Sequence, residues 1–500
     1  MYLYNTLMSR VLKVHPLDNV GVALEELKAG DVVILGGQEI KIIDHVPVGH
    51  KFALRYIHNG TKVIKYGQPI GRASQDIAQG AHVHVHNLQS GRKFGDTAIP
   101  IPTIPNPLEA LLDSLPREFL GYLRRDGRVG VRNHVLVLAT VHCANGVVER
   151  IGKEVPEVVP LAHIYGCSQL GEDLIQTRQV LESYAAHPNV GAALLIGLGC
   201  ETMPTEEMAD KLAERNVEVR CLLIQREGGS RSTVERGKRF LRELIQKTRK
   251  IRREPVPVSK LVVGLECGGS DAWSGITANP AVGVVSDAIV ALGGTVILSE
   301  VTEFIGAEQI LAARAVDAKV AQEILQAVER REAAARVMGV DLRGAQPSPG
   351  NMEGGLTTIE EKSLGAITKG GTSSIQEFLR YGQSPSRSGL VVMDTSGNDL
   401  ESVTAMVAGG AQAILFTTGR GTPVGNPIAP VIKIASNTTV YKKMADDIDF
   451  NAGTVLDGEP YVEVGRSIFM FLLKVANGKL TASERWRHRE FAIEPRGPKV

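Results

Sequence analysis

From about residue 118 onward, short apolar runs alternate with small-residue turns and helix-like segments, and this repeated order restricts the possible folds more than any other feature. The apolar runs are His134–Thr140, Ala192–Gly197, Leu261–Leu265, Thr295–Leu298, Leu390–Met393 and Ala413–Phe416. Strands that read as continuous apolar runs are covered by helices on both faces, and parallel strands need a crossover connection between them. The sequence therefore predicts an α/β fold with mainly parallel sheets in this large region.

The first part of the chain has a different pattern, typical of a small β domain over residues 11–90. Glycine-containing turns separate short β-branched runs, and we expect one short helix, Val22–Leu27, among them. The runs are Asp31–Leu35, Lys41–Ile43, Lys62–Tyr66 and His82–His86.

Prolines mark the expected domain boundaries. Residues 91–117 are predicted to form an extended linker, because proline at their density cannot sustain helix or sheet hydrogen bonding. A second boundary is expected where a basic helix end meets two further prolines, which divides the large region into subdomains 118–254 and 255–500. The prolines are Pro100, Pro102, Pro105 and Pro107 in the linker, and Pro255 and Pro257 at the second boundary.

Charge and composition exclude several kinds of partner. The 500-residue chain carries 56 Lys and Arg against 55 Asp and Glu, so it has no global basic footprint for nucleic acid. No apolar run suits a signal peptide or a membrane span. Five cysteines in so long a chain fit a reducing compartment better than a disulfide framework. We therefore expect a cytoplasmic protein without nucleic-acid or membrane partners.

The segment HVHVHN is the first candidate for chemistry. In a strand, His82, His84 and His86 would share one face, about 7 Å apart in succession, and could supply metal ligands or a ligand and a base. His45 and His50 could join the same face. The alternative is a half-exposed strand whose histidines face water.

Cysteines at apparent strand ends form a second candidate. Because the carboxyl ends of parallel strands converge on the ligand crevice, these thiols could together ligate iron or an iron–sulfur cluster. The alternative is that each cysteine packs as a small buried residue, and the absence of a CxxC pair favours it. The four cysteines are Cys143, Cys167, Cys200 and Cys267, whereas Cys221 is expected in the core.

Glycine-rich loops form a third candidate: LECGGSDAWSG, TKGGTSS and FTTGRGTPVGNP. Their backbone N–H groups could cradle a carboxylate or phosphate, and Glu266, Lys369 and Arg420 lie among the glycines as candidate catalytic residues. For each charged residue, surface exposure is the alternative. None of the loops matches a dinucleotide or P-loop pattern. The expected substrate-binding residues are Gly268, Gly269, Ser270, Asp271, Gly370, Gly371 and Thr372.

Two carboxylates, Glu300 and Glu303, follow the apolar run that ends at Leu298. Their position suits a base or a metal ligand. It equally suits a helix N-terminus, where acidic residues are favourable on electrostatic grounds alone.

The chain resembles the family of altronate and galactarate dehydratases along nearly its whole length. Matching segments include HPLDNVGVALEELKAG, GHKFAL, DIAQGAHVHVHN, GLECGGSDAWSGITANP, GGLTTIEEKSLG, TTGRGTPVG and RWRHRE. The segments YGCSQLG and KYGQPIG are more similar to the altronate branch. The resemblance implies an N-terminal β-clip domain, a linker, a large α/β catalytic region and dependence on iron. We expect Fe²⁺ as the cofactor, with Mn²⁺ as an alternative and a cysteine-bound iron–sulfur cluster as a less favoured one.

The reaction that the resemblance implies is dehydration of D-altronate to 2-keto-3-deoxy-D-gluconate. Removing the C2 proton of a carboxylate creates a nearly doubly charged aci-carboxylate, which requires cations and hydrogen-bond donors. We expect His84 and His86, with a strand-end thiolate or carboxylate, to hold the metal. Lys369 and Arg420 would neutralise the substrate carboxylate, and a histidine such as His82, or Glu266, would act as base.

One loop departs from the family pattern. In AQPSPGNMEGG, Gln346 and Met352 stand where the family pattern has Asn and Lys, which removes a possible carboxylate clamp. Alternative functions are galactarate dehydratase or another hydroxy-acid lyase, an iron–sulfur hydro-lyase that uses the four cysteines, and a non-catalytic sugar-acid-binding protein. A homo-oligomer is a further expectation.

Overall fold

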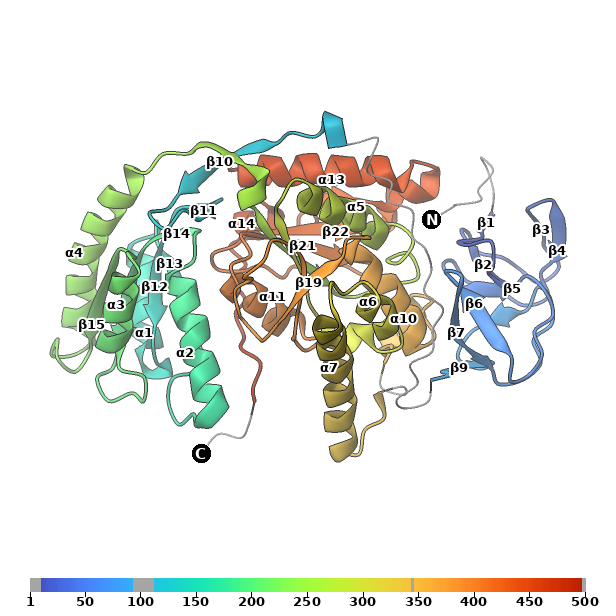
Figure 1. The fold of residues 1–500 in the computed structure, drawn as a ribbon, viewed down its shortest axis with the longest axis horizontal. Helices are drawn as coiled ribbons and strands as arrows, with labels where there is room; N and C mark the ends of the chain where they lie inside the picture. Colours follow the sequence, from blue (N-terminus) through green and yellow to red (C-terminus); the bar gives the residue numbers. More distant parts are fainter. Residues whose placement is uncertain (1–9, 93–111, 343–345, 497–500) are drawn as a thin grey trace.

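The N-terminal domain is built from short antiparallel strands (Figure 1). The computed structural model of the protein describes residues 10–92, 112–342 and 346–496, so the four linker prolines lie outside the described residues. A four-stranded sheet has the order β1-β2-β5-β8, beside a β3-β4 hairpin and a β6-β7-β9 sheet. The strands are β1 (Val11–Leu12), β2 (Val20–Ala23), β3 (Val32–Leu35), β4 (Gln38–Lys41), β5 (Lys51–Ala53), β6 (Lys62–Lys65), β7 (Gln68–Ala73), β8 (His82–Val83) and β9 (Leu88–Gln89).

Two local predictions in this domain are wrong. The segment Val22–Leu27 is not a helix, because its first residues pair in β2 with β1 and β5, and Leu27 forms a bridge with Val46. The strand predicted over His82–His86 ends at Val83. Asn87 closes a turn there, since its side-chain oxygen accepts from the His84 N–H at 2.9 Å and its own N–H donates to the His84 carbonyl at 3.0 Å.

The middle region contains a four-stranded parallel sheet with the order β13-β12-β14-β15. Apolar residues of α1 and α4 pack on one face of this sheet, and those of α2 and α3 pack on the other. A small antiparallel sheet, β11-β10-β16, joins this region to the next. The elements are β10 (Glu118–Leu123), β11 (Val129–Gly130), β12 (His134–Ala139), α1 (Asn145–Glu154), β13 (Val159–Leu161), α2 (Gly171–Ala185), β14 (Val190–Gly197), α3 (Thr205–Glu214), β15 (Val219–Leu223), α4 (Ser230–Arg249) and β16 (Glu254–Pro257).

The C-terminal region is organised around a seven-stranded parallel sheet with the order β19-β20-β18-β17-β21-β22-β23. Helices α5 and α13 cover one face, whereas α11 packs on the other together with α2 of the middle region. The six predicted apolar runs coincide with β12, β14, β17, β18, β20 and β21, which confirms the α/β fold class. The main elements are β17 (Val262–Cys267), α5 (Ala278–Ala291), β18 (Thr295–Leu298), β19 (Ile375–Leu379), β20 (Gly389–Met393), α11 (Asp399–Ala408), β21 (Ala413–Thr418), β22 (Val431–Ala435), β23 (Phe450–Asn451) and α13 (Tyr461–Ala476).

Further helices occupy the connections of this region. None of the helices in the described ranges combines the length and the apolar character that crossing a membrane requires. The remaining helices are α6 (Glu308–Ala312), α7 (Ala318–Val337), α9 (Pro349–Glu353), α10 (Ile359–Ala366), α12 (Thr438–Lys443) and α14 (Ala482–Trp486).

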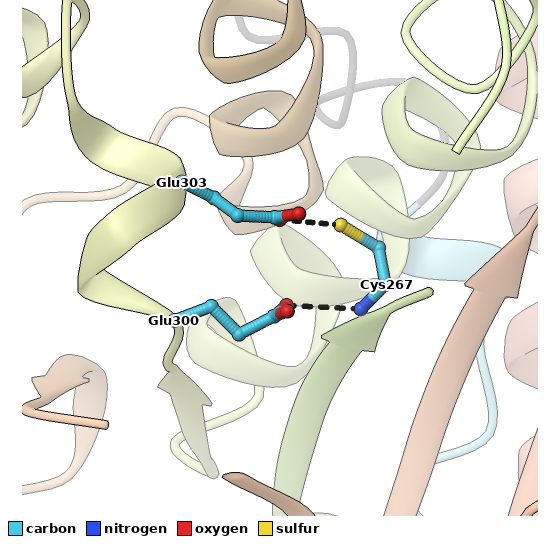
Figure 2. A group of neighbouring side chains, drawn as sticks. All are labelled: Cys267, Glu300 and Glu303. Carbon is cyan, nitrogen blue, oxygen red and sulfur yellow. Dashed lines mark hydrogen bonds between the residues drawn. The ribbon is translucent and has the colours of Figure 1, made fainter. Parts of the chain in front are cut away.

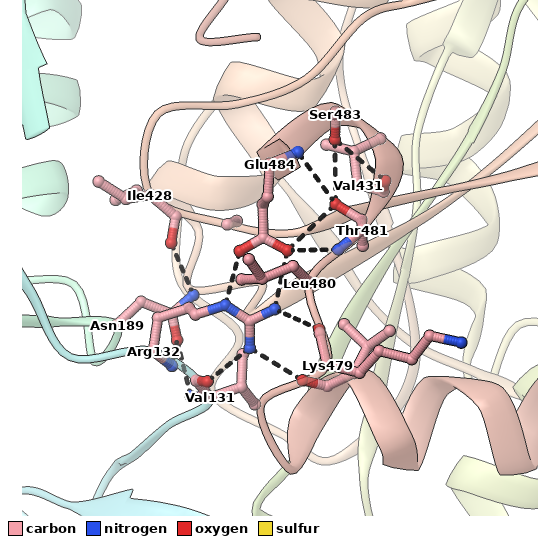
Figure 3. A network of polar contacts seen from close by, with 12 residues as sticks. Val131, Arg132, Asn189, Ile428, Val431, Lys479, Leu480, Thr481, Ser483 and Glu484 are labelled. Carbon is pink, nitrogen blue, oxygen red and sulfur yellow. Dashed lines mark hydrogen bonds and ion pairs between the residues drawn. The ribbon is translucent and has the colours of Figure 1, made fainter. Parts of the chain in front are cut away.

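A buried arginine fastens the middle region to the end of the chain (Figure 3). Arg132 binds both carboxylate oxygens of Glu484 on α14, at 2.6 and 2.8 Å. Its remaining N–H groups donate to backbone carbonyls of Val131, Val475 and Lys479. Planar two-point pairing and full use of the donors make this contact a strong one.

Replacing Arg132 with Met is therefore expected to lower the free energy of unfolding by about 3–5 kcal/mol, since Glu484 loses its ion-pair partner in a mostly buried setting. Urea-induced unfolding followed by circular dichroism measures this loss. The control is Arg150→Met, which breaks a solvent-exposed pair with Glu154 and should cost less than about 1 kcal/mol. Equal losses in the two variants would contradict the assignment.

Candidate active site

The carboxyl edge of the seven-stranded sheet has a reversal of strand order between β17 and β21, and we refer to this position as the crevice. From β17 the chain runs through α5 to β18, which lies on one side of β17. From β20 it runs through α11 to β21, which lies on the other side of β17. Open α/β sheets bind ligands at such a reversal of strand order. Two of the predicted glycine-rich loops meet here: the N–H groups of Gly419 and Arg420 donate to the Gly269 carbonyl at 3.1 and 3.0 Å, and Gly268 N–H donates to Thr417 at 3.1 Å.

A group of buried charged side chains lies at the ends of β17 and β18. Cys267 donates its thiol to Glu303 at 2.7 Å, and its backbone N–H donates to Glu300 at 3.0 Å (Figure 2). The ammonium of Lys369 lies 2.8 Å from the Cys267 sulfur, 2.8 Å from Glu300 and 3.2 Å from Glu303. Lys369 thus occupies the position of a cation inside a ring of acidic groups.

Backbone strain accompanies this group. Glu300 has φ of 68°, in the left-handed region that residues other than glycine enter only where their surroundings hold them. Its carboxylate accepts from the Cys267 N–H, and its own N–H donates to the Thr395 hydroxyl at 2.8 Å. The strained conformation therefore directs the carboxylate of Glu300 into the buried group rather than toward solvent.

The protonation states follow from burial and from neighbouring charges. Burial, and then the charges of Glu300 and Asp399, raise the pKa of Glu266 well above its usual range. Burial and the charge of Glu303 likewise raise the pKa of the Cys267 thiol. Burial alone would lower the pKa of Lys369, but the neighbouring acidic groups raise it. At neutral pH, Glu266 and Cys267 are thus protonated and Lys369 is charged.

This buried group has the composition of a possible metal site. Ligand atoms of Cys267, Glu300 and Glu303 lie within 4.8 Å of one another, as do those of Glu266, Glu300 and Asp399. In the first set, an ion would have to displace Lys369. In the second set, the protonated carboxyl group of Glu266 donates a hydrogen bond to the carboxylate of Glu300. Apart from this hydrogen bond, one oxygen of Glu266 and one oxygen of Glu300 have no partner. A divalent cation in the place of that proton would satisfy the same oxygens.

Histidines of the N-terminal domain form a second cluster, on the surface that contacts the large region. The rings of His82 and His84 stack with centroids 5.4 Å apart, and His86 lies 5.4 Å from His82. His50, which the sequence analysis named as a possible member, stacks on His84 at 4.8 Å. His45 instead pairs with Glu26 and does not belong to the cluster.

Carbonyl oxygens determine which ring nitrogens carry protons. His50 Nε2 lies 3.3 Å from the Glu353 carbonyl and His84 Nε2 lies 3.1 Å from the Met352 carbonyl, and a carbonyl can only accept. His50 Nδ1 is therefore unprotonated and accepts from His82 Nε2 at 3.0 Å. In the neutral forms, Nδ1 of His82 and Nδ1 of His84 retain lone pairs. A nitrogen that donates to a carbonyl while the other ring nitrogen keeps its lone pair is the usual arrangement of a metal-binding histidine.

Burial keeps these imidazoles neutral. Burial, followed by the neighbouring histidines, lowers the pKa of His82 to about 3. Burial, and then Lys51, lowers the pKa of His84 to about 4. Neutral imidazole is the form that binds metals, so both side chains can act as metal ligands at neutral pH.

A buried ion triad fastens the N-terminal domain, which carries the histidines, to the large region. Lys51 and Lys65 of the N-terminal domain contact the two carboxylate oxygens of Glu361 on α10 at 2.9 and 2.8 Å, and all three side chains are fully buried. Lys51 also donates to the Gly355 carbonyl at 2.7 Å. Burial alone would raise the pKa of Glu361, but the two ammonium groups lower it. The N-terminal domain is therefore held rigidly beside the loop that carries Met352.

The other predicted residues lie in varied settings. Arg420 lies at the rim of the crevice, paired with Glu353 at 2.8 Å. Asp271 accepts from Ser436 and Asn437 at 2.8 and 3.0 Å, so its carboxylate joins the loops after β17 and β22. Ser270 accepts at its carbonyl from Asn351 of α9, at 2.8 Å.

The loop with Gly370, Gly371 and Thr372 has an internal partner in place of the expected substrate carboxylate. The N–H groups of Thr372 and Ser373 donate to Asp287 of α5 at 2.9 Å. The cradle predicted from the glycines thus forms, but the protein's own carboxylate fills it. Sequence could not show this, because Asp287 lies more than 80 positions away.

The expectation that four strand-end cysteines meet in one crevice is wrong. Cys267 is buried at the end of β17 in the C-terminal sheet, whereas Cys143, Cys167 and Cys200 are exposed in loops after β12, β13 and β14 of the other sheet. The apolar runs belong to two separate parallel sheets, and their spacing along the chain does not reveal which sheet each run joins.

Sequence reasoning also missed several members of the site. The Lys51–Lys65–Glu361 triad and Asp399 received no attention, although a lysine inside each of the apolar segments KFAL and KVIK is a usable signal. Lysines are rarely fully buried unless they are paired. Their acidic partner could not have been identified, because Glu361 follows about 300 residues later.

Three family models match the chain in order along its length. They describe the altronate/galactarate dehydratase SAF domain over residues 9–91, the D-galactarate dehydratase/altronate hydrolase second domain over residues 121–249, and the D-galactarate/altronate dehydratase C-terminal domain over residues 258–499.

Curated relatives match over almost their full length. The altronate dehydratase of Bacillus subtilis (strain 168) is 38% identical over 497 residues, which is 97% of this chain and 99% of that protein. The altronate dehydratase of Escherichia coli (strain K12) is 39% identical over 494 residues, 96% of this chain and 98% of that protein. The galactarate dehydratase (L-threo-forming) of the same strain is 37% identical over 508 residues, 96% of each. These identities are too similar to separate the two substrates.

Proposed function

This chain belongs to the altronate/galactarate dehydratase family, and from that membership we propose that it dehydrates D-altronate to 2-keto-3-deoxy-D-gluconate and water in the cytoplasm. Membership makes it a sugar-acid dehydratase, a hydro-lyase. The observation that carries the proposal is that α9 contacts both His84 of the N-terminal domain and the loops with Ser270 and Arg420 at the crevice. Dehydration of a hydroxy acid needs both a base and neutralising cations at one place.

We assign the metal to the histidine cluster. His84, with His86 of the same cluster, would hold Fe²⁺ or Mn²⁺, because the contact of His84 with the Met352 carbonyl leaves Nδ1 free to bind. The buried acidic group is the alternative position, where Lys369 already supplies a positive charge. When bound, the ion supplies Lewis-acid stabilisation of the charge that develops on the substrate carboxylate.

The side chains of the crevice then have distinct tasks. His82 takes the C2 proton at Nδ1, which its hydrogen bond to His50 leaves unprotonated. Arg420 exchanges its contact with Glu353 for the substrate carboxylate. Asp399, whose carboxylate lies against Gly268, protonates the departing C3 hydroxyl. Burial and the charge of Glu300 raise the pKa of Asp399 to about 7, which suits a general acid at neutral pH.

Altronate is preferred over galactarate on the grounds of charge. Galactarate has a carboxylate at each end, so its site requires a second cation. Met352 stands in the short helix α9, which contacts His84, at the position where the resemblance to the family leads us to expect Lys. An apolar side chain there supports a substrate with one carboxylate. Galactarate dehydratase is the second candidate function, because a relative of that activity is 37% identical over 96% of the chain.

The test is a panel of hexonic and hexaric acids assayed anaerobically with ferrous iron. We expect keto-acid formation from D-altronate, with kcat/KM at least about tenfold above that for galactarate, the ratio that about 1.4 kcal/mol of lost charge pairing produces. A higher kcat/KM for galactarate than for D-altronate would contradict this proposal and support galactarate dehydratase instead. Binding of sugar acids without any turnover would instead indicate a non-catalytic protein.

The histidine assignment has its own test. We expect the double variant His82→Ala/His84→Ala to lose at least about 10²-fold in kcat and to retain much less iron after gel filtration, because it removes a base and a ligand together. The control His45→Ala lies in the same domain but outside the cluster, and it should keep both iron and activity. Unchanged iron content and turnover in the double variant would disprove the assignment.

A further inference from the structure

Three cysteines lie at the carboxyl edge of the four-stranded sheet in the middle region. Cys143 follows β12, Cys167 follows β13 and Cys200 follows β14, and these three strands are neighbours in the order β13-β12-β14. Neighbouring strands are about 4.8 Å apart, and parallel strands all end at the same edge. The three thiols therefore come from adjacent loops on one edge of one sheet.

Hydrogen bonds fasten the loops that carry Cys143 and Cys167 to each other. The His142 N–H donates to the Tyr165 carbonyl at 2.9 Å, and the Asn145 side chain donates to the His163 carbonyl at 2.8 Å. Gly166 approaches β12 so closely that a Cβ at this position would lie 2.3 Å from the Thr140 carbonyl oxygen. These contacts hold the two cysteines at fixed positions.

The loop with Cys200 is also ordered by local contacts. Gly199 has φ of 120° and donates its N–H to Glu201, and the Gln225 side chain lies 3.7 Å from the Cys200 sulfur. The Thr140 N–H donates to the Ile196 carbonyl at 3.0 Å, which continues the pairing of β12 with β14 up to this loop. All three cysteine loops thus meet around the end of β12.

The exposure of these thiols is unusual. Cysteine is among the most buried residue types, yet all three are exposed, whereas Cys221 is half-buried and Cys267 is buried. Ser168, directly after Cys167, has φ of 56°, a strained conformation that tends to occur at functional sites. Exposed apolar side chains lie in the same segment, namely Ile164, Leu170 and Ile175. Exposed thiols close to apolar side chains suit an inorganic cofactor, because apolar side chains around such a cofactor limit the access of solvent.

We propose that Cys143, Cys167 and Cys200 hold an iron–sulfur cluster of the [4Fe–4S] type through three thiolates, with the fourth iron open to an oxygen ligand. The three sulfurs are not all within 4.8 Å of one another. Thiolates on a single ion, at about 2.3 Å from it, would lie less than about 4 Å apart, so a larger centre fits better. Soft thiolates select iron–sulfur clusters, and binding releases the three thiol protons to solvent.

This site is separate from the crevice and does not depend on the proposed dehydratase function. Its three ligands belong to the middle sheet, whereas the crevice lies between β17 and β21 of the C-terminal sheet. The C-terminal segment connects the two, since Tyr165 donates its hydroxyl to the Ile493 carbonyl at 3.0 Å and Ser396 donates its N–H to Glu494 at 3.1 Å.

The test is anaerobic reconstitution of the full chain with equal amounts of ferrous and ferric iron and with sulfide, which together have the oxidation level of a [4Fe–4S]2+ cluster, followed by desalting. We expect about four irons and four acid-labile sulfides per chain, with broad visible absorbance. The triple variant Cys143→Ser/Cys167→Ser/Cys200→Ser should lose the sulfide and the absorbance. The control Cys221→Ser changes a cysteine of β15, away from the edge, and should keep both.

Other outcomes would overturn the proposal. They are absence of labile sulfide in the unmodified chain, retention of sulfide by the triple variant, and binding of one metal ion without sulfide. Circular dichroism verifies that the triple variant folds. If it does not fold, the three single variants replace it, and each is expected to lower the sulfide content, whereas three unchanged values would reject the site.

Discussion

The Lys369→Met variant is expected to lose about 3–5 kcal/mol of folding free energy and at least about 10²-fold in kcat. The Lys369 ammonium is the cation that contacts Cys267, Glu300 and Glu303 together, and its side chain is 1% exposed. Met has a similar volume but no charge, so two buried carboxylates would be left without this partner. These carboxylates would have to take up protons or become hydrated. Either change would disturb the buried charged group at the ends of β17 and β18.

Two further variants make this prediction specific. Lys211→Met removes an exposed lysine that pairs with Glu207 on the same helix, and it should change stability by less than about 1 kcal/mol. Adding Glu303→Gln to Lys369→Met should restore part of the stability, because one buried charge disappears, but should not restore turnover. Chemical unfolding and a keto-acid assay measure both effects. Normal stability of the Lys369→Met variant would show that the buried group is not held by charge.

Replacing Glu361 with Gln is expected to release the N-terminal domain and to lower turnover at least about 10²-fold. Lys51 and Lys65 would remain buried without their carboxylate, a loss of about 3–5 kcal/mol. Because Glu361 belongs to the large region and the two lysines belong to the N-terminal domain, the lost free energy weakens the contact between these two parts of the chain. The histidines would then leave the crevice, and His84 would lose its contact with the Met352 carbonyl.

Limited proteolysis and activity together test this release. We expect rapid cleavage between the N-terminal domain and the rest of the chain in the Glu361→Gln variant, and a fall in turnover of at least about 10²-fold. Glu26→Gln removes an exposed carboxylate of the N-terminal domain that pairs with His45, and it should behave as the unmodified chain does. Protection from the protease equal to that of the unmodified chain would show that the triad does not hold the domains together.

Local sequence was sufficient for the strands of the large region. The run Thr295–Leu298 is β18 itself, and Leu390–Met393 lies within β20. These runs could be recognised because a strand that is buried on both faces consists almost entirely of apolar residues. Local sequence was not sufficient in the N-terminal domain. There, pairing with β1 and β5 made a strand of residues that read as a helix, and the Asn87 turn ended β8 early.

Residue type and local pattern named His82, His84, Glu266 and Lys369 as candidates, and their roles stay predictions. Their states were decided by the tertiary structure. Whether a carboxyl group is protonated depends on burial and on charges nearby, and Glu266 acquires both from residues far along the chain. The tautomer of His84 likewise depends on the Met352 carbonyl, 268 residues away. Apolar periodicity acts over a few neighbouring residues, so sequence determines the elements, whereas electrostatic interactions act through space, so only the folded chain determines the chemistry.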